Sequence, residues 1–126
     1  LARSAAGRTA LTGTIYARPA RRSPQDVVAE TLALRHATGF EDTLAAGGAV
    51  RFTHDVPGLP VTVAWGTRDR LLLRRQGVRA KETIPGARLV RLPGCGHVPM
   101  HDDPALVARV VLDTTRSASG VPYPHG

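Results

Sequence analysis

Two side chains, Asp69 and His97, have the chemical types and the placement that acid–base catalysis requires. Asp69 ends the segment PVTVAWGTRD (residues 60–69), and His97 ends the segment LPGCGH (residues 92–97). Each follows a short apolar run that indicates a buried strand, and the carboxyl ends of neighbouring parallel strands lie at the same edge of a sheet. An Asp that accepts the Nδ1 proton of a His fixes the imidazole tautomer and stabilises the imidazolium. The pair is therefore predicted to be the orienting and general-base part of a nucleophilic site.

An alternating pattern of strands and helices has to position these two residues. Strands are predicted over residues 60–65 and 87–92, and Pro and Gly stand at their ends. A helix over residues 74–83 separates them, and another opens at residues 103–104 and runs to about residue 113. This spacing is typical of a right-handed, parallel βαβ unit in an α/β fold. Two parallel strands cannot form a sheet that is buried on both faces, so we expect further strands outside this sequence.

The first 56 residues favour helices and loops. Ser23 is a predicted N-cap, and Pro24 is suited to the first helical position of a helix that ends before Gly39. A shorter helix is expected over residues 40–46, and a weaker pattern covers residues 1–12. Residues 116–126 are rich in Ser, Gly and Pro and are predicted to be a flexible tail.

Each residue of the pair also has an ordinary structural interpretation. An Asp after a strand commonly forms a turn or caps the next helix, and a His in a Gly-rich loop is often a satisfied polar group. Their joint occurrence in consecutive strand-end loops favours the catalytic interpretation. Cys95 is an alternative nucleophile, but it lies only two positions from His97, so a small packed thiol is the preferred interpretation.

Other polar residues are weaker candidates for a site. His97, His101, Asp102 and Asp103 together resemble a metal cluster, but they have no recognised ligand spacing, and Asp103 is better explained as a helix N-cap. We therefore expect neither a metal nor a cofactor.

Four further residues complete the set of candidates. A helix-surface and a loop position are predicted for His36 and His54, and Trp65 is expected to pack at the end of the sheet. Weak candidates for contact with substrate are Trp65 and Val98.

The charge of the chain invites a different class of function. The formal net charge is +7 and the sequence pI is about 11.2, which is compatible with nucleic-acid binding. The basic residues are nearly all arginines scattered along the chain, however, and no aromatic residues interleave with them for base stacking. We expect a solvated arginine surface and no nucleic-acid partner. The tightest arginine groups are Arg18, Arg21 and Arg22, then Arg68, Arg70, Arg74, Arg75 and Arg79.

The predicted cellular context follows from what the chain lacks. No apolar run is long enough to span a bilayer, and the first residues do not resemble a signal peptide, so neither a membrane nor export is expected. A single cysteine allows no internal disulfide and fits a reducing compartment, and a cytoplasmic location is predicted.

The segments at residues 60–70 and 84–100, followed by DDP at residues 102–104, resemble the end of an α/β-hydrolase. In that family the catalytic triad runs in the order Ser, Asp or Glu, His along the chain. The resemblance implies that Asp69 is the acid, that His97 is the catalytic histidine, and that residues 104–115 form the last helix. It covers residues 57–115 as the end of the hydrolase core, and residues 1–56 resemble the end of the helical lid.

One departure from the family is large. The nucleophilic serine of the family sits in a Gly-x-Ser-x-Gly turn, and this sequence contains no such motif. The chain begins with Leu1 and its one methionine is Met100, so we expect that an N-terminal part supplying the nucleophile is absent. The first hypothesis is therefore a C-terminal fragment of a serine-type hydrolase for small ester-like substrates, inactive alone. The alternative is a non-catalytic remnant or a basic binding module.

Overall fold

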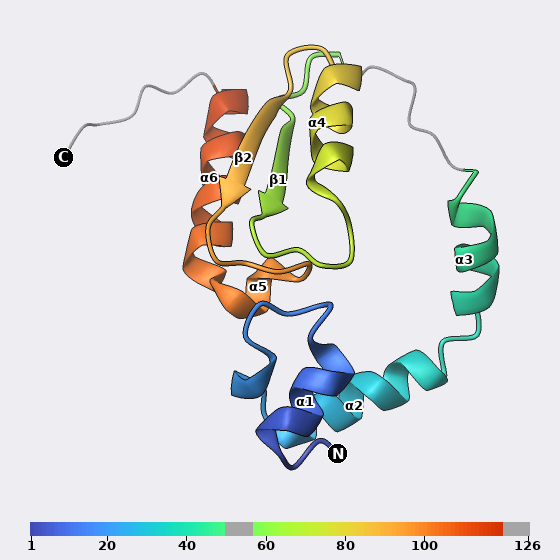
Figure 1. Cartoon of the computed structure of the whole chain (residues 1–126). Helices are drawn as coiled ribbons and strands as arrows, with labels where there is room; N and C mark the ends of the chain where they lie inside the picture. The colour runs from blue at the N-terminus through green and yellow to red at the C-terminus, as the bar shows by residue number, and fades with distance from the viewer. Residues whose placement is uncertain (50–56, 120–126) are drawn as a thin grey trace. The chain divides into compact units, whose positions relative to one another are not determined.

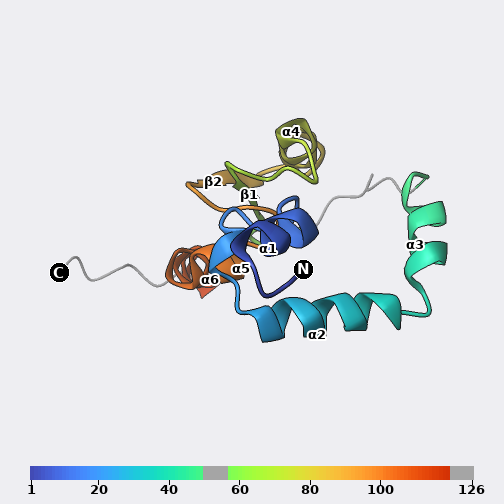
Figure 2. The same ribbon diagram turned by 60° about the horizontal axis from the view of Figure 1, so that its bottom comes forward.

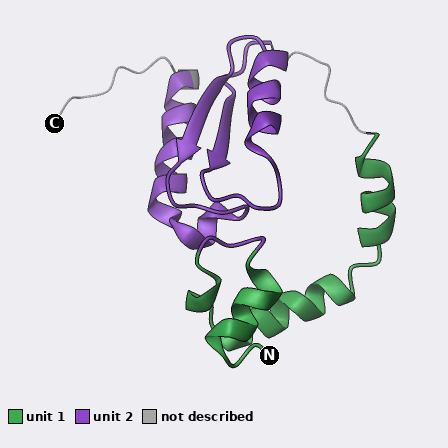
Figure 3. Cartoon of the chain, in the orientation of Figure 1, with its two compact units in different colours: residues 1–13, 18–52 green, residues 14–17, 53–126 purple. Residues whose placement is uncertain are grey.

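A computed structural model of the chain describes residues 1–49 and 57–119, which divide into two compact units (Figures 1 and 3). The first unit comprises Leu1–Gly13 and Arg18–Phe52, and the second comprises Thr14–Ala17 and Thr53–Gly126. The boundary predicted near residue 56 lies outside the described residues. Thr14–Ala17, which the sequence placed in the helical segment, instead belongs with the unit that carries the sheet.

The first unit consists of short helices: α1 (Ala5–Thr12), the 3-10 helix η1 (Pro19–Arg21), α2 (Pro24–Arg35) and α3 (Phe40–Gly47). Figure 2 shows α2 and α3 as separate helices joined by a short turn. The hydroxyl of Ser23 accepts a hydrogen bond from the backbone N–H of Asp26, which confirms the predicted N-cap of α2. Val27 is the fully buried side chain of this helix.

The second unit is built around two parallel strands, β1 (Thr62–Gly66) and β2 (Arg88–Leu92), with Thr62 opposite Arg88 and Gly66 opposite Leu92. The helices α4 (Arg74–Thr83) and α6 (Pro104–Ser119) lie on opposite faces of this sheet (Figures 1 and 2), and the short α5 (Pro99–Asp102) precedes α6. The predicted α/β architecture with a parallel βαβ unit is confirmed.

Alternate side chains of β1 point to the two helices, as the pleat of a strand requires. Trp65 packs on α4, where a side chain at the buried Gly77 would come within 2.6 Å of the indole ring. On the other face the hydroxyl of Thr62 accepts a hydrogen bond of 2.8 Å from the hydroxyl of Thr114 in α6. The expectation that Trp65 packs near the sheet end is confirmed, and Gly77 is the reason that α4 approaches so closely.

The element bounds agree with the sequence except near the C-terminus. α6 continues to Ser119, into the stretch predicted to be a flexible tail, and the hydroxyls of Thr115 and Ser117 donate to carbonyl oxygens of this helix. The predicted end of this helix near residue 113 was therefore too early. The helices η1 and α5 were not predicted. Among the described residues, no helix is both long enough and apolar enough to cross a membrane.

Candidate active site

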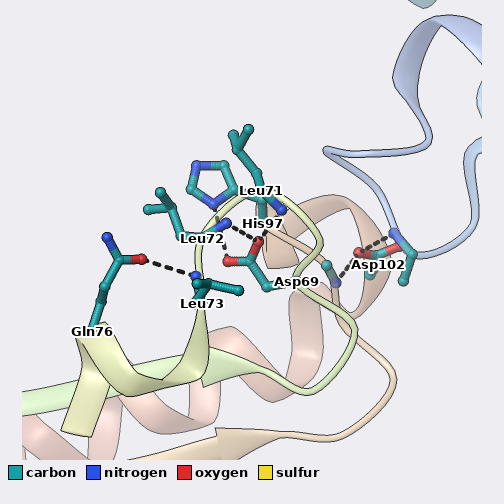
Figure 4. A network of polar contacts seen from close by, with 9 residues as sticks. Asp69, Leu71, Leu72, Leu73, Gln76, His97 and Asp102 are labelled. Atoms are coloured by element: carbon teal, nitrogen blue, oxygen red, sulfur yellow. Dashed lines mark hydrogen bonds and ion pairs between the residues drawn. The ribbon is translucent and has the colours of Figure 1, made fainter. Parts of the chain in front are cut away.

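The loop that follows β1 holds the Asp69 carboxylate in one orientation. Its Oδ1 accepts hydrogen bonds of 2.9 Å from the backbone N–H groups of Leu71 and Leu72 (Figure 4). Asp69 therefore forms a turn, as one of the ordinary interpretations proposed, but it does not cap α4. The N-cap of that helix is Leu73, whose N–H donates to the side chain of Gln76. The second carboxylate oxygen of Asp69 is left for another partner.

That partner is His97, in the loop after β2. The distance between His97 Nδ1 and Asp69 Oδ2 is 3.1 Å, so the expected approach of the two residues is present. The Asp69 side chain is 7% exposed and that of His97 is 31% exposed. The acid is thus shielded from water while the imidazole remains accessible, and Figure 4 shows the second ring nitrogen turned away from Asp69. This is the arrangement that a general base oriented by a carboxylate needs.

The electrostatics of the pair favour an ionised acid. Burial raises the pKa of Asp69, but the hydrogen bonds from Leu72 N–H, the His97 ring and Leu71 N–H, together with the charge of His97, lower it by more. The net result is a pKa below the ordinary value of 3.8. At neutral pH Asp69 is therefore a carboxylate that accepts the Nδ1 proton of His97.

The two strand-end loops are joined by the side chain and backbone of Thr67. Its N–H donates to the carbonyl oxygen of Leu92 at 3.0 Å, and its hydroxyl accepts from the N–H of Gly94 at 2.9 Å. A Cβ atom on Gly66 would lie 2.3 Å from the carbonyl oxygen of Gly96. Only glycine permits this approach of the two loops, which sets the separation between the acid and the histidine.

A pocket of about 130 Å³ opens beside the pair. Trp65 lines it, whereas Val98, the other weak candidate for substrate contact, is not among its lining residues. The Nε1 atom of Trp65 is buried and has no hydrogen-bond partner within the described parts of the chain. The wall is otherwise mainly apolar. Its principal residues are Ala64, Trp65, Asp69, Leu72, His97 and Pro99.

Two further candidates, Cys95 and Asp103, have structural roles. Cys95 is fully buried, and its Sγ lies 3.7 Å from the carbonyl oxygen of Pro93, as expected for a packed thiol. Asp103 Oδ1 accepts from the N–H of Leu106 at 2.9 Å, which agrees with its predicted role as the cap of α6.

Two histidines outside the pair, His101 and His36, lie in the described part of the chain. The ring of His101 meets the Tyr16 ring edge to face, with centroids 5.4 Å apart. Exposed His36 lies at the C-cap of α2, and His54 is outside the described residues. Within residues 1–49 and 57–119, no three His, Cys, Asp or Glu side chains are grouped as metal ligands would be.

Sequence reasoning did not identify the role of Asp102. Its Oδ2 accepts from the N–H groups of Gly96, at 2.7 Å, and Ala17, at 3.1 Å. No local pattern could have shown this, because Ala17 is 85 positions away along the chain.

A parallel sheet between two helical layers, with an Asp–His pair at the carboxyl ends of its strands, defines an α/β protein of the hydrolase type. The chain belongs to the alpha/beta hydrolase family, whose family model matches residues 1–110.

Curated relatives match a smaller part of the chain. The uncharacterized protein Rv2715 of Mycobacterium tuberculosis and the uncharacterized protein Mb2734 of Mycobacterium bovis are each 41% identical to it over 63 residues. That match covers 48% of this chain and 18% of each relative, so the chain spans less than a fifth of their length. No solved structure matches the chain.

Proposed function

We propose that this chain is the C-terminal part of a serine-type α/β-fold hydrolase and supplies the acid and the histidine of its catalytic triad. The observation that carries the proposal is the 3.1 Å contact between His97 Nδ1 and Asp69 Oδ2 beside a pocket. Family membership supports the same interpretation.

The chemistry follows from the tautomer that this contact favours. With its proton on Nδ1 and donated to Asp69, neutral His97 presents an unprotonated Nε2. Nε2 takes the proton of a serine hydroxyl as the serine oxygen attacks an ester carbonyl. The imidazolium then returns this proton to the leaving alkoxide, and an acyl-enzyme forms. Water repeats the two steps in the second half of the reaction and regenerates the serine.

The serine has to come from polypeptide outside this sequence. Ser4 and Ser23 cap helices, and the hydroxyl of Ser117 donates to the carbonyl oxygen of Asp113 within α6. None of these three lines the pocket beside His97, and the sequence has no Gly-x-Ser-x-Gly turn. The side chain of the fourth serine, Ser119, lies outside the described residues, and Ser119 does not stand in such a turn either. We therefore infer that the atom that attacks the substrate is not supplied by this chain.

The sheet supports the proposal that further strands complete it. Among the described residues β1 pairs on one edge only, and Ala64 in its centre is exposed. An apolar groove of about 300 Å³ lies between β1 and α6, lined in part by Val107, Val110 and Val111. Inner strands of parallel sheets are covered on both faces and paired on both edges. We take the part of the hydrolase that bears the nucleophile to be the occupant of this edge and groove, since the relatives are several times longer than the matched segment.

The substrate class is small and ester-like. The pocket beside the pair has apolar walls and a volume of about 130 Å³, which suits a short acyl or alkyl group rather than a polymer. The mechanism above needs neither a metal nor a cofactor.

The test begins with the coding sequence upstream of residue 1. The segment encoded there is expressed together with this chain, and the assembled protein is treated with a fluorophosphonate probe that labels nucleophilic serines. We expect an in-frame strand, Gly-x-Ser-x-Gly turn and helix, and rapid labelling of that serine. Substitution His97→Ala should slow labelling by several orders of magnitude, because the general base is lost.

A substitution on the surface of α6 serves as the control. Asp113→Asn changes an exposed side chain of α6 that does not line the pocket and should leave labelling unchanged. A stop codon directly before residue 1, or labelling that is equally fast in His97→Ala, would overturn the proposal in favour of a non-catalytic remnant. A mobility shift with DNA that disappears at high salt would instead favour the basic binding module.

A further inference from the structure

The backbone around His97 is held by a segment from the beginning of the chain. The carbonyl oxygen of Ile15 accepts hydrogen bonds from the N–H groups of His97, at 2.8 Å, and Val98, at 3.3 Å. A Cβ atom on Gly96 would lie 2.7 Å from both Ala17 N and Ile15 O, so only glycine allows this segment to lie so close. Thr14–Ala17 therefore acts as a brace along one side of the histidine loop.

Asp102 fastens the brace to the loop. A single carboxylate oxygen, Oδ2, accepts from the N–H of Gly96 at 2.7 Å and from the N–H of Ala17 at 3.1 Å (Figure 4). Hydrogen bonds to an ionised acceptor are about twice as strong as those between neutral groups. The peptide immediately before His97 is thus tied to a charged side chain, and the peptide of His97 itself is tied to Ile15.

Two of these contacts hold His97 itself, and the third holds the peptide that precedes it. Asp69 holds the ring nitrogen of His97, Ile15 holds its backbone N–H, and Asp102 holds the preceding peptide. The ring can keep its 3.1 Å contact with Asp69 only while its Cα stays in place. A displacement of about 1 Å at such a site costs on the order of 10²-fold in rate.

We propose that Asp102 is a positioning residue, which holds the Cys95–Gly96 peptide against the Thr14–Ala17 brace and so keeps His97 within hydrogen-bonding distance of Asp69. The inference rests on the proposed function for its catalytic meaning. Asp102 does not touch the pocket, and its carboxylate is engaged by backbone amides.

A purely structural role is the competing explanation, because the ring contact between Tyr16 and His101 also joins the brace to α5. The two explanations differ in what they predict for Asp69. If Asp102 only stabilises the fold, its loss should leave the Asp–His contact intact in the folded molecules. If it positions His97, the contact should weaken while the unit stays folded.

The experiment is an NMR comparison of variants of this chain, with folding checked by circular dichroism. In Asp102→Ala we expect the His97 Nδ1 proton to exchange with solvent at least about tenfold faster than in the parent chain. The pKa of Asp69, followed by the ¹³C shift of its carboxyl carbon, should rise toward the ordinary value because its hydrogen bond from His97 is weakened. Asp102→Glu, which keeps a carboxylate, should restore part of both signals.

Two controls separate positioning from stability. Asp103→Asn removes the same charge at the next position and leaves an equally good helix cap, so both readouts should stay unchanged. Thr114→Val removes the hydrogen bond to Thr62 and destabilises the same unit far from the loop. Equal effects of Asp102→Ala and Thr114→Val on the His97 proton would overturn the proposal.

If Asp102→Ala does not fold, a second pair of variants tests the same proposal. Asp102→Asn and Asp103→Asn both keep the side-chain shape and both lose one charge. Faster exchange of the His97 Nδ1 proton in the first alone is expected, and equal exchange in both overturns the proposal. In the assembled protein, Asp102→Ala should lower kcat about 10²-fold at unchanged KM. If the NMR effects appear but no serine is labelled in the assembled protein, the proposed function fails and the positioning role stands.

Discussion

The backbone N–H of Arg68 donates a hydrogen bond of 2.9 Å to the carbonyl oxygen of Cys95, and this bond joins the loop of the acid to the loop of the histidine. The two residues immediately precede the Asp69 and Gly96–His97 positions. Backbone contacts between the two loops therefore fix the positions from which the Asp69 and His97 side chains approach each other. The tests that follow probe either the pair itself or the contacts that align it.

Replacement of the acid is expected to change the state of the histidine. In the parent chain, neutral His97 should carry its proton on Nδ1, and ¹⁵N NMR should show a protonated Nδ1 and an unprotonated Nε2. Asp69→Asn removes the charged acceptor and should give a mixture of tautomers. In the assembled protein the rate should fall by about 10⁴-fold, as is typical for this change in a catalytic triad. An unchanged tautomer in Asp69→Asn would contradict the assigned role.

The lowered pKa of Asp69 predicts a pH dependence of stability. A carboxyl whose pKa is lower in the folded state than in the unfolded state stabilises the fold above the unfolded value, here about 3.8. That contribution is lost as the pH falls from this value through the folded pKa. Urea unfolding across this range should give a steeper loss of the free energy of unfolding for the parent chain than for Asp69→Asn. Identical slopes for the two proteins would contradict the prediction.

Gly66→Ala should disturb the junction of the two loops. The added methyl group would lie 2.3 Å from Gly96 O and 2.5 Å from Cys95 O, both backbone atoms that cannot rotate away. We expect a loss of about 1–3 kcal/mol in the free energy of unfolding, measured by urea denaturation. Gly47→Ala is the matched control, because a Cβ there meets nothing within 4 Å and the helix α3 tolerates alanine. Equal stability of the two variants would contradict this account of Gly66.

The groove beside β1 predicts a variant that blocks assembly without unfolding this chain. Val111 lines the groove and is 54% exposed, whereas Leu112, its neighbour in α6, is 49% exposed and is not among the lining residues. Val111→Lys places an unpaired charge where an apolar partner should pack, and it should prevent association with the upstream polypeptide. Leu112→Lys should not. Co-purification and size-exclusion chromatography measure the difference, and equal association of both variants would rule out this groove as the interface.

Much of the second unit was predictable from local patterns. The helix α4 has the predicted bounds, Arg74–Thr83, and the two strands lie within one or two residues of the expected ranges. These elements carry strong local signals, such as β-branched runs and the Pro and Gly residues at their ends. The loops that bear Asp69 and His97 follow directly from them.

What the sequence by itself determined was the pair of residue types, the order of strands and helices, and the family that they resemble. What only the tertiary structure decided was how the pair is held. Thr14–Ala17 packs against Gly96, and the N–H groups of Gly96 and Ala17 both donate to Asp102. Periodicity and capping arise between residues a few positions apart, whereas these contacts bring a backbone amide or carbonyl to a partner up to 85 positions away. Backbone amides and carbonyls are the same in every residue, so no letter of the sequence marks which of them will meet.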